Sequence, residues 1–130
     1  EIVFSWASKL ALMDIRIISL ADTVGLASAA QVKKITEYLV NMLPKTEIGV
    51  HLHSSPLNRK EKLEAALKAG CLRFDGAMKG IGGCPMADDE LVGNMDTEFI
   101  VSYLASQKIS MGLNSEALNY CSKMASEIFI

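Results

Sequence analysis

Three short apolar stretches, each followed by a helical pattern, constrain the fold of this chain more than any other feature. They are IRIISLAD (15–22), EIGVHLH (47–53) and CLRFDGAM (71–78), and their β-branched residues and flanking turn residues predict strands. The first stretch is apolar on both faces, as buried parallel strands are. Strands that alternate with helices predict an α/β fold with a parallel sheet built from right-handed crossover units.

Five helices are expected around these strands. Val3, Trp6, Leu10 and Met13 recur at helical spacing near the start of the chain. The other four helices are bounded by capping and stop signals: Ser28 with Gln31 as a capping box and Pro44 as the stop, Pro56 to Gly70, a start at Thr97, and a start at Asn114 or Ser115. The last helix is expected to present Leu118, Cys121, Met124 and Ile128 on one face.

The strand count predicts part of a barrel. A complete eight-stranded (β/α)8 barrel needs about 250 residues, whereas this chain has 130 residues, with a short fourth strand expected near 92–94. We therefore expect roughly half a barrel, as one partial catalytic domain over residues 1–130. The alternative is a small open sheet complete in itself. The first helix has no start signal, which favours a chain that lacks the other half.

Composition excludes several classes of protein. Half of the residues are hydrophobic and the net charge is −2, which suits one buried core. Lysine and arginine form no run that would bind nucleic acid, and no apolar stretch is long enough to span a membrane. The first residues lack the features of a signal peptide. Three cysteines at irregular spacing argue against a disulfide framework and favour the reducing cytoplasm.

The polar candidates follow the strands, where parallel α/β folds place their functional sites. His51 and His53, the only histidines, are two residues apart and so lie on one face of their strand, with Ile48, Val50 and Leu52 on the other. Two such imidazoles can chelate a divalent metal. The alternative is a pair of hydrogen-bonded structural histidines.

Asp22 and the glycine-rich segment 79–94 (KGIGGCPMADDELVGN) provide the other candidates. Asp22 closes a strand and either acts in catalysis or binds backbone amides of the following turn. Asn94 either offers an amide oxygen to a metal or caps a turn. Lys79 either recognises an anion or is exposed. Cys84 stands among glycines, as a reactive loop thiol or an incidental one, whereas Cys71 and Cys121 are expected to pack in the core.

Four segments, ISLADTVG, GVHLHS, RFDGAMKGIGGCPMADDELVGN and MDTE, occur in an order and spacing that closely resemble the C-terminal half of the hydroxymethylglutaryl-CoA lyases. The resemblance covers residues 14–128, and its Gly-Gly-Cys-Pro loop is highly specific. Related isopropylmalate and citramalate synthases typically carry a Gly-Glu-Arg type segment at this loop. The resemblance implies strands 5 to 8 of a (β/α)8 barrel.

The resemblance also implies a function and a site. The family cleaves 3-hydroxy-3-methylglutaryl-CoA to acetyl-CoA and acetoacetate with Mg²⁺ or Mn²⁺. Its site residues match His51, His53 and Asn94 as metal ligands, Cys84 as the catalytic loop cysteine and Asp22 as a catalytic aspartate, with Gly82, Gly83 and Lys79 at the substrate. Either His51 or Asp22 would take the hydroxyl proton, and the glycine loop would close over the substrate and deliver Cys84 to protonate the enolate.

Some expectations concern what the chain lacks. The family's remaining metal ligand, an aspartate of the first strand, and its neighbouring arginine have no counterpart here, so the chain alone is expected to be inactive. SSP after His53 and Lys79 depart from the pattern of many members. The partners expected are an acyl-CoA substrate and either an N-terminal half-barrel or a second copy, as a homo-oligomer. The alternatives are an acyl-transferring synthase of the same superfamily and a non-catalytic half-barrel.

Overall fold

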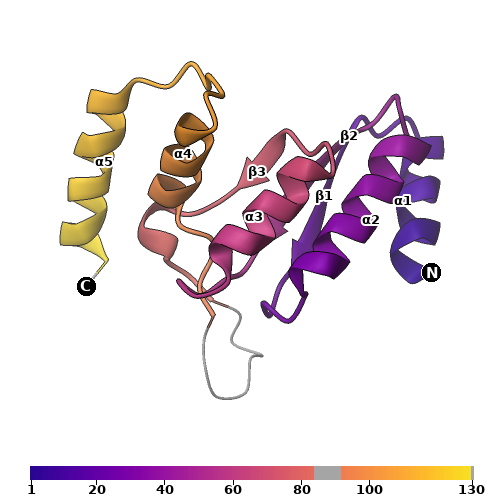
Figure 1. The fold of residues 1–130 in the computed structure, drawn as a ribbon, viewed down its shortest axis with the longest axis horizontal. Helices are drawn as coiled ribbons and strands as arrows, with labels where there is room; N and C mark the ends of the chain where they lie inside the picture. The colour runs from indigo at the N-terminus through magenta and orange to yellow at the C-terminus, as the bar shows by residue number, and fades with distance from the viewer. Residues whose placement is uncertain (84–91, 130) are drawn as a thin grey trace.

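The computed structural model describes residues 1–83 and 92–129, which form an alternating α/β arrangement (Figure 1). In chain order the elements are α1 (Ile2–Leu12), β1 (Ile17–Asp22), α2 (Ala29–Met42), β2 (Glu47–Leu52), α3 (Arg59–Lys68), β3 (Arg73–Asp75), the 3-10 turn η1 (Met78–Gly80), α4 (Thr97–Ser106) and α5 (Ser115–Ile128). Helices α1 and α5 lie at opposite ends of the long axis (Figure 1).

The strands form a parallel sheet in the order β1-β2-β3, as predicted. In register, Ala21 of β1 lies beside His51 of β2, which lies beside Asp75 of β3. Because the strands run in the same direction, their C-terminal ends meet at one edge of the sheet. The polar residues that follow the strands are therefore brought together there.

One face of the sheet forms the core against helices α2 and α3 (Figure 1). Ile48, Val50 and Leu52 are each less than 5% exposed, as their alternation with the histidines predicts. Val32 of α2 and Leu63 of α3 belong to one cluster with Val50 and Leu52, and Leu39 of α2 belongs to a second cluster with Ile48. The sequence at the start of α2 forms the predicted capping box between Ser28 and Gln31, and Gly70 ends the α3 segment with φ +87°.

The other face of the sheet carries polar contacts between strands. The Ser19 hydroxyl donates to Asp75 Oδ2 at 2.6 Å, and Arg73 Nη2 donates to Glu47 Oε2 at 3.2 Å. Ile17 on this face is 48% exposed. The expectation that the first strand is buried on both sides is therefore wrong for the described residues, since α1 and α2 pack on the Ile18 side.

Some boundaries differ from the prediction. The third helix begins at Arg59 and not at Pro56, because Asn58 Oδ1 accepts the Ser55 N–H at 2.9 Å and makes a turn first. Strand β3 has three residues, since Gly76 and the η1 turn follow it directly. The short fourth strand expected near 92–94 is replaced, in the described part of the chain, by isolated bridges: Gly83 to Gly93, His53 to Asn94 and Ala77 to Asp96. Each goes to a different segment, so no continuous ladder forms.

The predicted apolar face of α5 is mostly exposed. Met124 and Ile128 are 41% and 64% exposed, and Cys121 is exposed as well. The residue that α5 buries in the described structure is Ala125. Cys121 is therefore a surface thiol and not the packing residue expected from the helical pattern.

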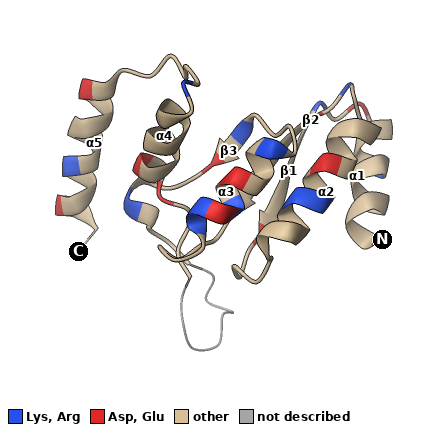
Figure 2. Ribbon diagram, viewed as in Figure 1, with Lys and Arg blue, Asp and Glu red and all other residues tan. Residues whose placement is uncertain are grey.

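The outer surface carries charges of both signs on α2 and α3, whereas most of α1 is uncharged (Figure 2). Ile2, Trp6 and Met13 at this end of the molecule are 76%, 59% and 70% exposed. None of the helices among the described residues has the length and apolar character needed to cross a membrane.

Candidate metal and active site

The carboxyl edge of the sheet brings His51, His53 and Asn94 together. His51 lies near the end of β2, and His53 follows it. The segment after residue 91 joins this strand end, because the Ser54 N–H donates to the Gly93 carbonyl at 3.1 Å and the Met95 N–H donates to the Leu52 carbonyl at 3.0 Å. These bonds place Asn94 opposite His53.

The two nitrogens of the His53 ring have different environments. Nδ1 lies 2.8 Å from the carbonyl oxygen of Val92, and the residue is 5% exposed. A carbonyl can only accept, so Nδ1 carries the proton and Nε2 keeps its lone pair for a metal. The His51 ring lies edge-on to His53 with the ring centroids 5.5 Å apart, and the two rings can each present a nitrogen to one cation.

Asn94 supplies a third donor. Its Nδ2 donates to the Ile81 carbonyl at 2.8 Å, which fixes the amide, while its buried Oδ1 has no hydrogen-bond partner among the described residues. A buried acceptor without a partner is uncommon in proteins, and an oxygen in this state is available to a bound water or cation. Two imidazole nitrogens and one amide oxygen fit a divalent cation. In the described ranges no three histidine, cysteine or carboxylate side chains form such a group, so the site depends on the asparagine.

The glycines before position 84 allow the chain to approach Asn94 closely. Gly80 and Gly82 have φ of +65° and +85°, which favours glycine. A Cβ on Gly82 would lie 2.9 Å from Asn94 Nδ2, and one on Gly80 would lie 2.9 Å from the Asn94 carbonyl oxygen. Gly83 forms a bridge with Gly93. Three of the predicted site residues, Gly82, Gly83 and Asn94, are thus in one packed turn.

A pocket of about 340 Å³ adjoins Asn94, with Ser54, Arg59, Lys79 and Asp96 among its lining residues. Arg59 lies 3.8 Å from Asp96, and Lys79 Nζ lies 3.9 Å from Glu98 Oε1. Lys79 therefore lines the pocket beside an acidic neighbour and is exposed, and its role at the substrate stays a prediction. A larger cavity of about 720 Å³ lies at the other end of the strands, beside Arg16 and Thr46. It contains none of the candidate residues.

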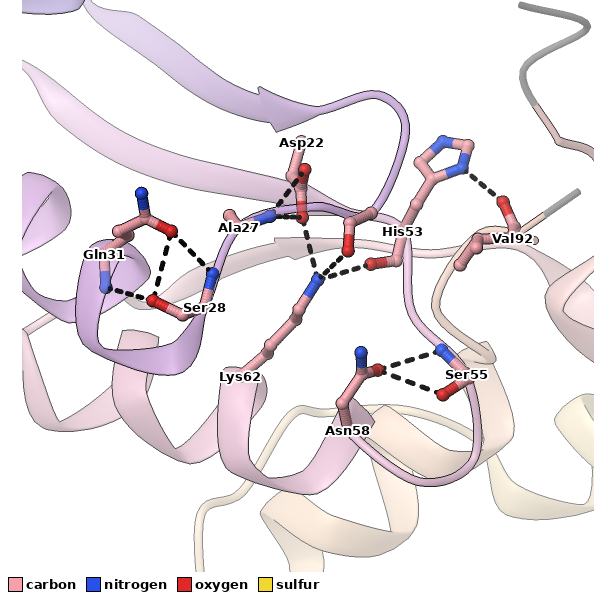
Figure 3. A network of polar contacts seen from close by, with 10 residues as sticks. Asp22, Ala27, Ser28, Gln31, His53, Ser55, Asn58, Lys62 and Val92 are labelled. Atoms are coloured by element: carbon pink, nitrogen blue, oxygen red, sulfur yellow. Dashed lines mark hydrogen bonds and ion pairs between the residues drawn. The ribbon is translucent and has the colours of Figure 1, made fainter. Parts of the chain in front are cut away.

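Asp22 lies at the edge of this site, and its carboxylate is already engaged (Figure 3). Both carboxylate oxygens lie 3.2 Å from the Ala27 N–H, and Oδ2 accepts from Lys62 Nζ at 2.8 Å. Its backbone carbonyl accepts the His53 N–H at 3.3 Å. The turn-binding alternative for Asp22 is thus observed, alongside an ion pair that the sequence reasoning missed.

Lys62 is the functional candidate that the sequence reasoning overlooked. It is 1% exposed, although lysine is almost never fully buried without a partner. Its position could have been noticed, because Lys62 and Ala66 are one helical turn apart and share the inward face of α3. A lysine on an apolar stripe requires a buried acceptor nearby, and Asp22 is that acceptor.

The cysteines fall into different classes. Cys71 is fully buried, and burial raises the pKa of its thiol to about 11, so it stays protonated and inert. Its Sγ donates to the Arg73 carbonyl at 3.1 Å. These contacts agree with the expected packing role. Cys84, the predicted catalytic thiol, lies outside the described residues.

Comparisons with known proteins find similarity to acyl-CoA lyases. A family model described as HMGL-like matches residues 1–125. The chain is 36% identical over 110 residues to hydroxymethylglutaryl-CoA lyase YngG of Bacillus subtilis, which covers 85% of this chain and 36% of that protein. It is 34% identical over 101 residues to (R)-citramalyl-CoA lyase of Chloroflexus aurantiacus, covering 78% and 32%. The chain thus spans about a third of the length of these relatives.

Solved structures give the same result for the fold. The crystal structure of a Bacillus subtilis HMG-CoA lyase superposes with a TM-score of 0.85 at 33% identity, over 96% of this chain and 42% of that one. An HMG-CoA lyase from Acinetobacter baumannii, in complex with coenzyme A and 3-methylmalate, superposes with a TM-score of 0.80 at 31% identity, over 95% and 41%.

Proposed function

The chain belongs to the HMGL-like family, and from this premise we propose that it forms part of the active site of a divalent-metal-dependent carbon–carbon lyase. The proposed reaction cleaves 3-hydroxy-3-methylglutaryl-CoA to acetyl-CoA and acetoacetate. The observation that carries the proposal is the grouping of two histidines with a buried, unpartnered asparagine oxygen. Because the chain spans about a third of its relatives, the activity is proposed for the protein that carries it.

We propose that His51, His53 and Asn94 hold Mg²⁺ or Mn²⁺ together with ligands from outside residues 1–130. When bound, the cation supplies Lewis-acid stabilisation of the negative charge that develops on the hydroxyl oxygen of the substrate. The His53 bond to Val92 and the Asn94 bond to Ile81 support this role. Each bond orients its side chain and leaves the other polar atom, His53 Nε2 or Asn94 Oδ1, available to a metal. Such supporting bonds are typical of metal ligands in proteins.

The reaction requires a base and then an acid. The tertiary hydroxyl loses its proton, its electrons form the ketone of acetoacetate, and the broken carbon–carbon bond leaves its electron pair on the acetyl-CoA enolate. We propose Asp22 as the base, because the single lone pair of a neutral His51 ring would be used on the cation. Among the described residues, Asp22 Oδ1 accepts only from the Ala27 N–H and so can still take a proton. Protonation of the enolate carbon is assigned to the Cys84 thiol on the resemblance of the Gly-Gly-Cys-Pro segment.

The substrate is proposed to bind over the pocket beside Asn94, whose lining includes Lys79 and Arg59. These cations suit an anionic acyl-CoA, which carries a carboxylate and phosphates. The cytoplasm is the proposed location, since a reducing compartment preserves the free thiols Cys71 and Cys121.

A second candidate reaction is the cleavage of (R)-citramalyl-CoA. The observation that favours it is that the Chloroflexus aurantiacus citramalyl-CoA lyase is 34% identical to this chain, close to the 36% of the Bacillus subtilis lyase. Both substrates are tertiary alcohols of acyl-CoA type, so the same residues would serve both. Ser54 lines the pocket with a buried hydroxyl that has no partner in the described ranges, and we propose it as a residue that would distinguish their acyl groups.

The proposal is tested in the full-length protein with Mn²⁺. Release of acetoacetate from 3-hydroxy-3-methylglutaryl-CoA is measured against release of pyruvate from citramalyl-CoA, and His53→Ala and Asn94→Ala are expected to lose Mn²⁺ affinity and turnover. Asn119→Ala, on the exposed face of α5, serves as the control. Condensation of acetyl-CoA with 2-oxoacids, without cleavage, would identify a synthase instead. Activity that survives in both variants would refute the metal site.

A further inference from the structure

We propose that Lys62 is a positioning residue that holds the His53 end of β2 in place for the cation. The proposal rests on the function proposed above, since it concerns the same metal site. Lys62 belongs to α3 and donates to the backbone carbonyl of His53, so it would act through the backbone that carries the ring.

The ammonium group of Lys62 has three acceptors from separate parts of the chain. Nζ donates to Asp22 Oδ2 at 2.8 Å, to the Gly25 carbonyl at 2.8 Å and to the His53 carbonyl at 3.1 Å. An ammonium has three donors, so all of them are used. Figure 3 shows the side chain reaching from α3 to these groups at the ends of two strands.

Stability alone is a poor explanation for this arrangement. A lysine that is 1% exposed has lost its hydration, and buried ion pairs can often be replaced by apolar residues without loss of stability. Their best supported role is to select one arrangement of the surrounding groups. Here the selected arrangement joins the turn after β1 to the residue that follows β2.

This arrangement fixes His53 from three sides. Its carbonyl accepts from Lys62, its N–H donates to the Asp22 carbonyl, and its ring Nδ1 donates to Val92. Removing the Lys62 bond would leave the ring bond and the N–H bond in place but take away the partner of the His53 carbonyl. Outer partners of metal ligands typically change metal affinity by about 10–100-fold when they are removed, and we expect Lys62 to behave in this way.

The test measures Mn²⁺ affinity by calorimetry in the full-length protein, with folding monitored by circular dichroism. Lys62→Met keeps the length of the side chain and removes the charge, and it is expected to weaken Mn²⁺ binding by about 10–100-fold. Lys68→Met is the matched control, because Lys68 lies on the same helix, is exposed and pairs only with Glu64 among the described residues. It is expected to bind Mn²⁺ as the wild type does.

A double variant, Lys62→Met with Asp22→Asn, removes both buried charges and so separates folding from positioning. Weakened Mn²⁺ binding in this folded double variant supports the proposal. Wild-type affinity in folded Lys62→Met or in the double variant overturns it, and so does failure of the double variant to fold, which would assign Lys62 to the fold alone. His53→Ala tests the proposed metal site separately from the positioning role of Lys62. If this variant leaves Mn²⁺ binding unchanged, the proposed metal site itself is wrong.

Discussion

At the scale of single residues, Cys84 carries the sharpest chemical prediction. In the full-length protein, Cys84→Ser is expected to lower kcat by about 10²–10⁴-fold, the usual contribution of a general acid. A serine hydroxyl has nearly the size of the thiol but is a much weaker acid. Mn²⁺ affinity should stay unchanged, because the metal ligands proposed here do not include the thiol. The measurement is kcat at saturating Mn²⁺ together with a Mn²⁺ titration.

The other cysteines provide matched controls for this variant. Cys121→Ser is expected to change nothing, since its side chain is exposed. Cys71→Ser should lower the free energy of unfolding while leaving kcat intact, because this thiol is buried beneath β2 and β3. A kcat near the wild-type value in Cys84→Ser would mean that the thiol has no part in the chemistry.

Single residues also show what sequence can and cannot predict about a site. The alternation along 47–53 placed both histidines on one face, and the structure brings Asn94 beside His53. The Lys62–Asp22 pair was not predicted, because its partners are far apart in the sequence and lysine is usually exposed. The role of Asp22 as a catalytic group stays a prediction.

At the scale of elements, the turn formed by residues 80–83 is tested by Gly82→Ala. A residue with a side chain in the left-handed conformation lowers the free energy of unfolding by roughly 1–2 kcal/mol. The new Cβ would also lie 2.9 Å from the Asn94 amide nitrogen. We therefore expect lower stability and, because the amide must shift, Mn²⁺ affinity reduced by at least about 10-fold. Calorimetry of Mn²⁺ binding and urea unfolding measure the two effects.

Gly112→Ala is the matched control for this turn. Gly112 also has a positive φ, +64°, but nothing lies within 4 Å of its added Cβ. It is expected to lose similar stability without any change in Mn²⁺ affinity. Equal Mn²⁺ affinities in the two variants would show that the close approach of Gly82 to Asn94 is irrelevant to the metal.

Elements whose ends are set by hydrogen bonds between nearby residues were predicted better than features that depend on packing against distant parts of the chain. Ser28 and Gln31 cap α2 as their spacing predicts, since the bonds involved are within one turn. Cys121 of α5 was wrongly expected to pack in the core, because helical spacing marks an apolar stripe but cannot show which neighbour it meets. The fourth strand was predicted from VGN, a segment whose bonds go to separate partners.

At the scale of the whole molecule, the apolar surface around α1 predicts association of residues 1–130 when produced alone. Ile2, Trp6 and Met13 are more than half exposed, and β1 is an edge strand of the sheet in the described structure. Unpaired edges and apolar patches favour pairing with another chain. Sedimentation velocity across micromolar concentrations should show species larger than a monomer.

A surface variant identifies the region responsible. Trp6→Lys should reduce the association, whereas Tyr120→Lys, on the exposed face of α5 at the other end of the molecule, should not. A monomer at every concentration would contradict the prediction. Whether the fold is half of a closed barrel also stays a prediction at this scale, although the three parallel strands and the likeness to solved HMG-CoA lyases agree with it.

The bond between His53 and Val92 has a consequence for how the protein can change over evolutionary time. Val92 orients the ring of His53, and Asn94, two positions later, offers its own oxygen. One insertion or deletion between them would disturb two donors at once, so this short stretch has little freedom to vary in length. In a segment that holds a single donor, a later substitution can compensate for a change in length. In this stretch, compensation would require both donors to be restored together.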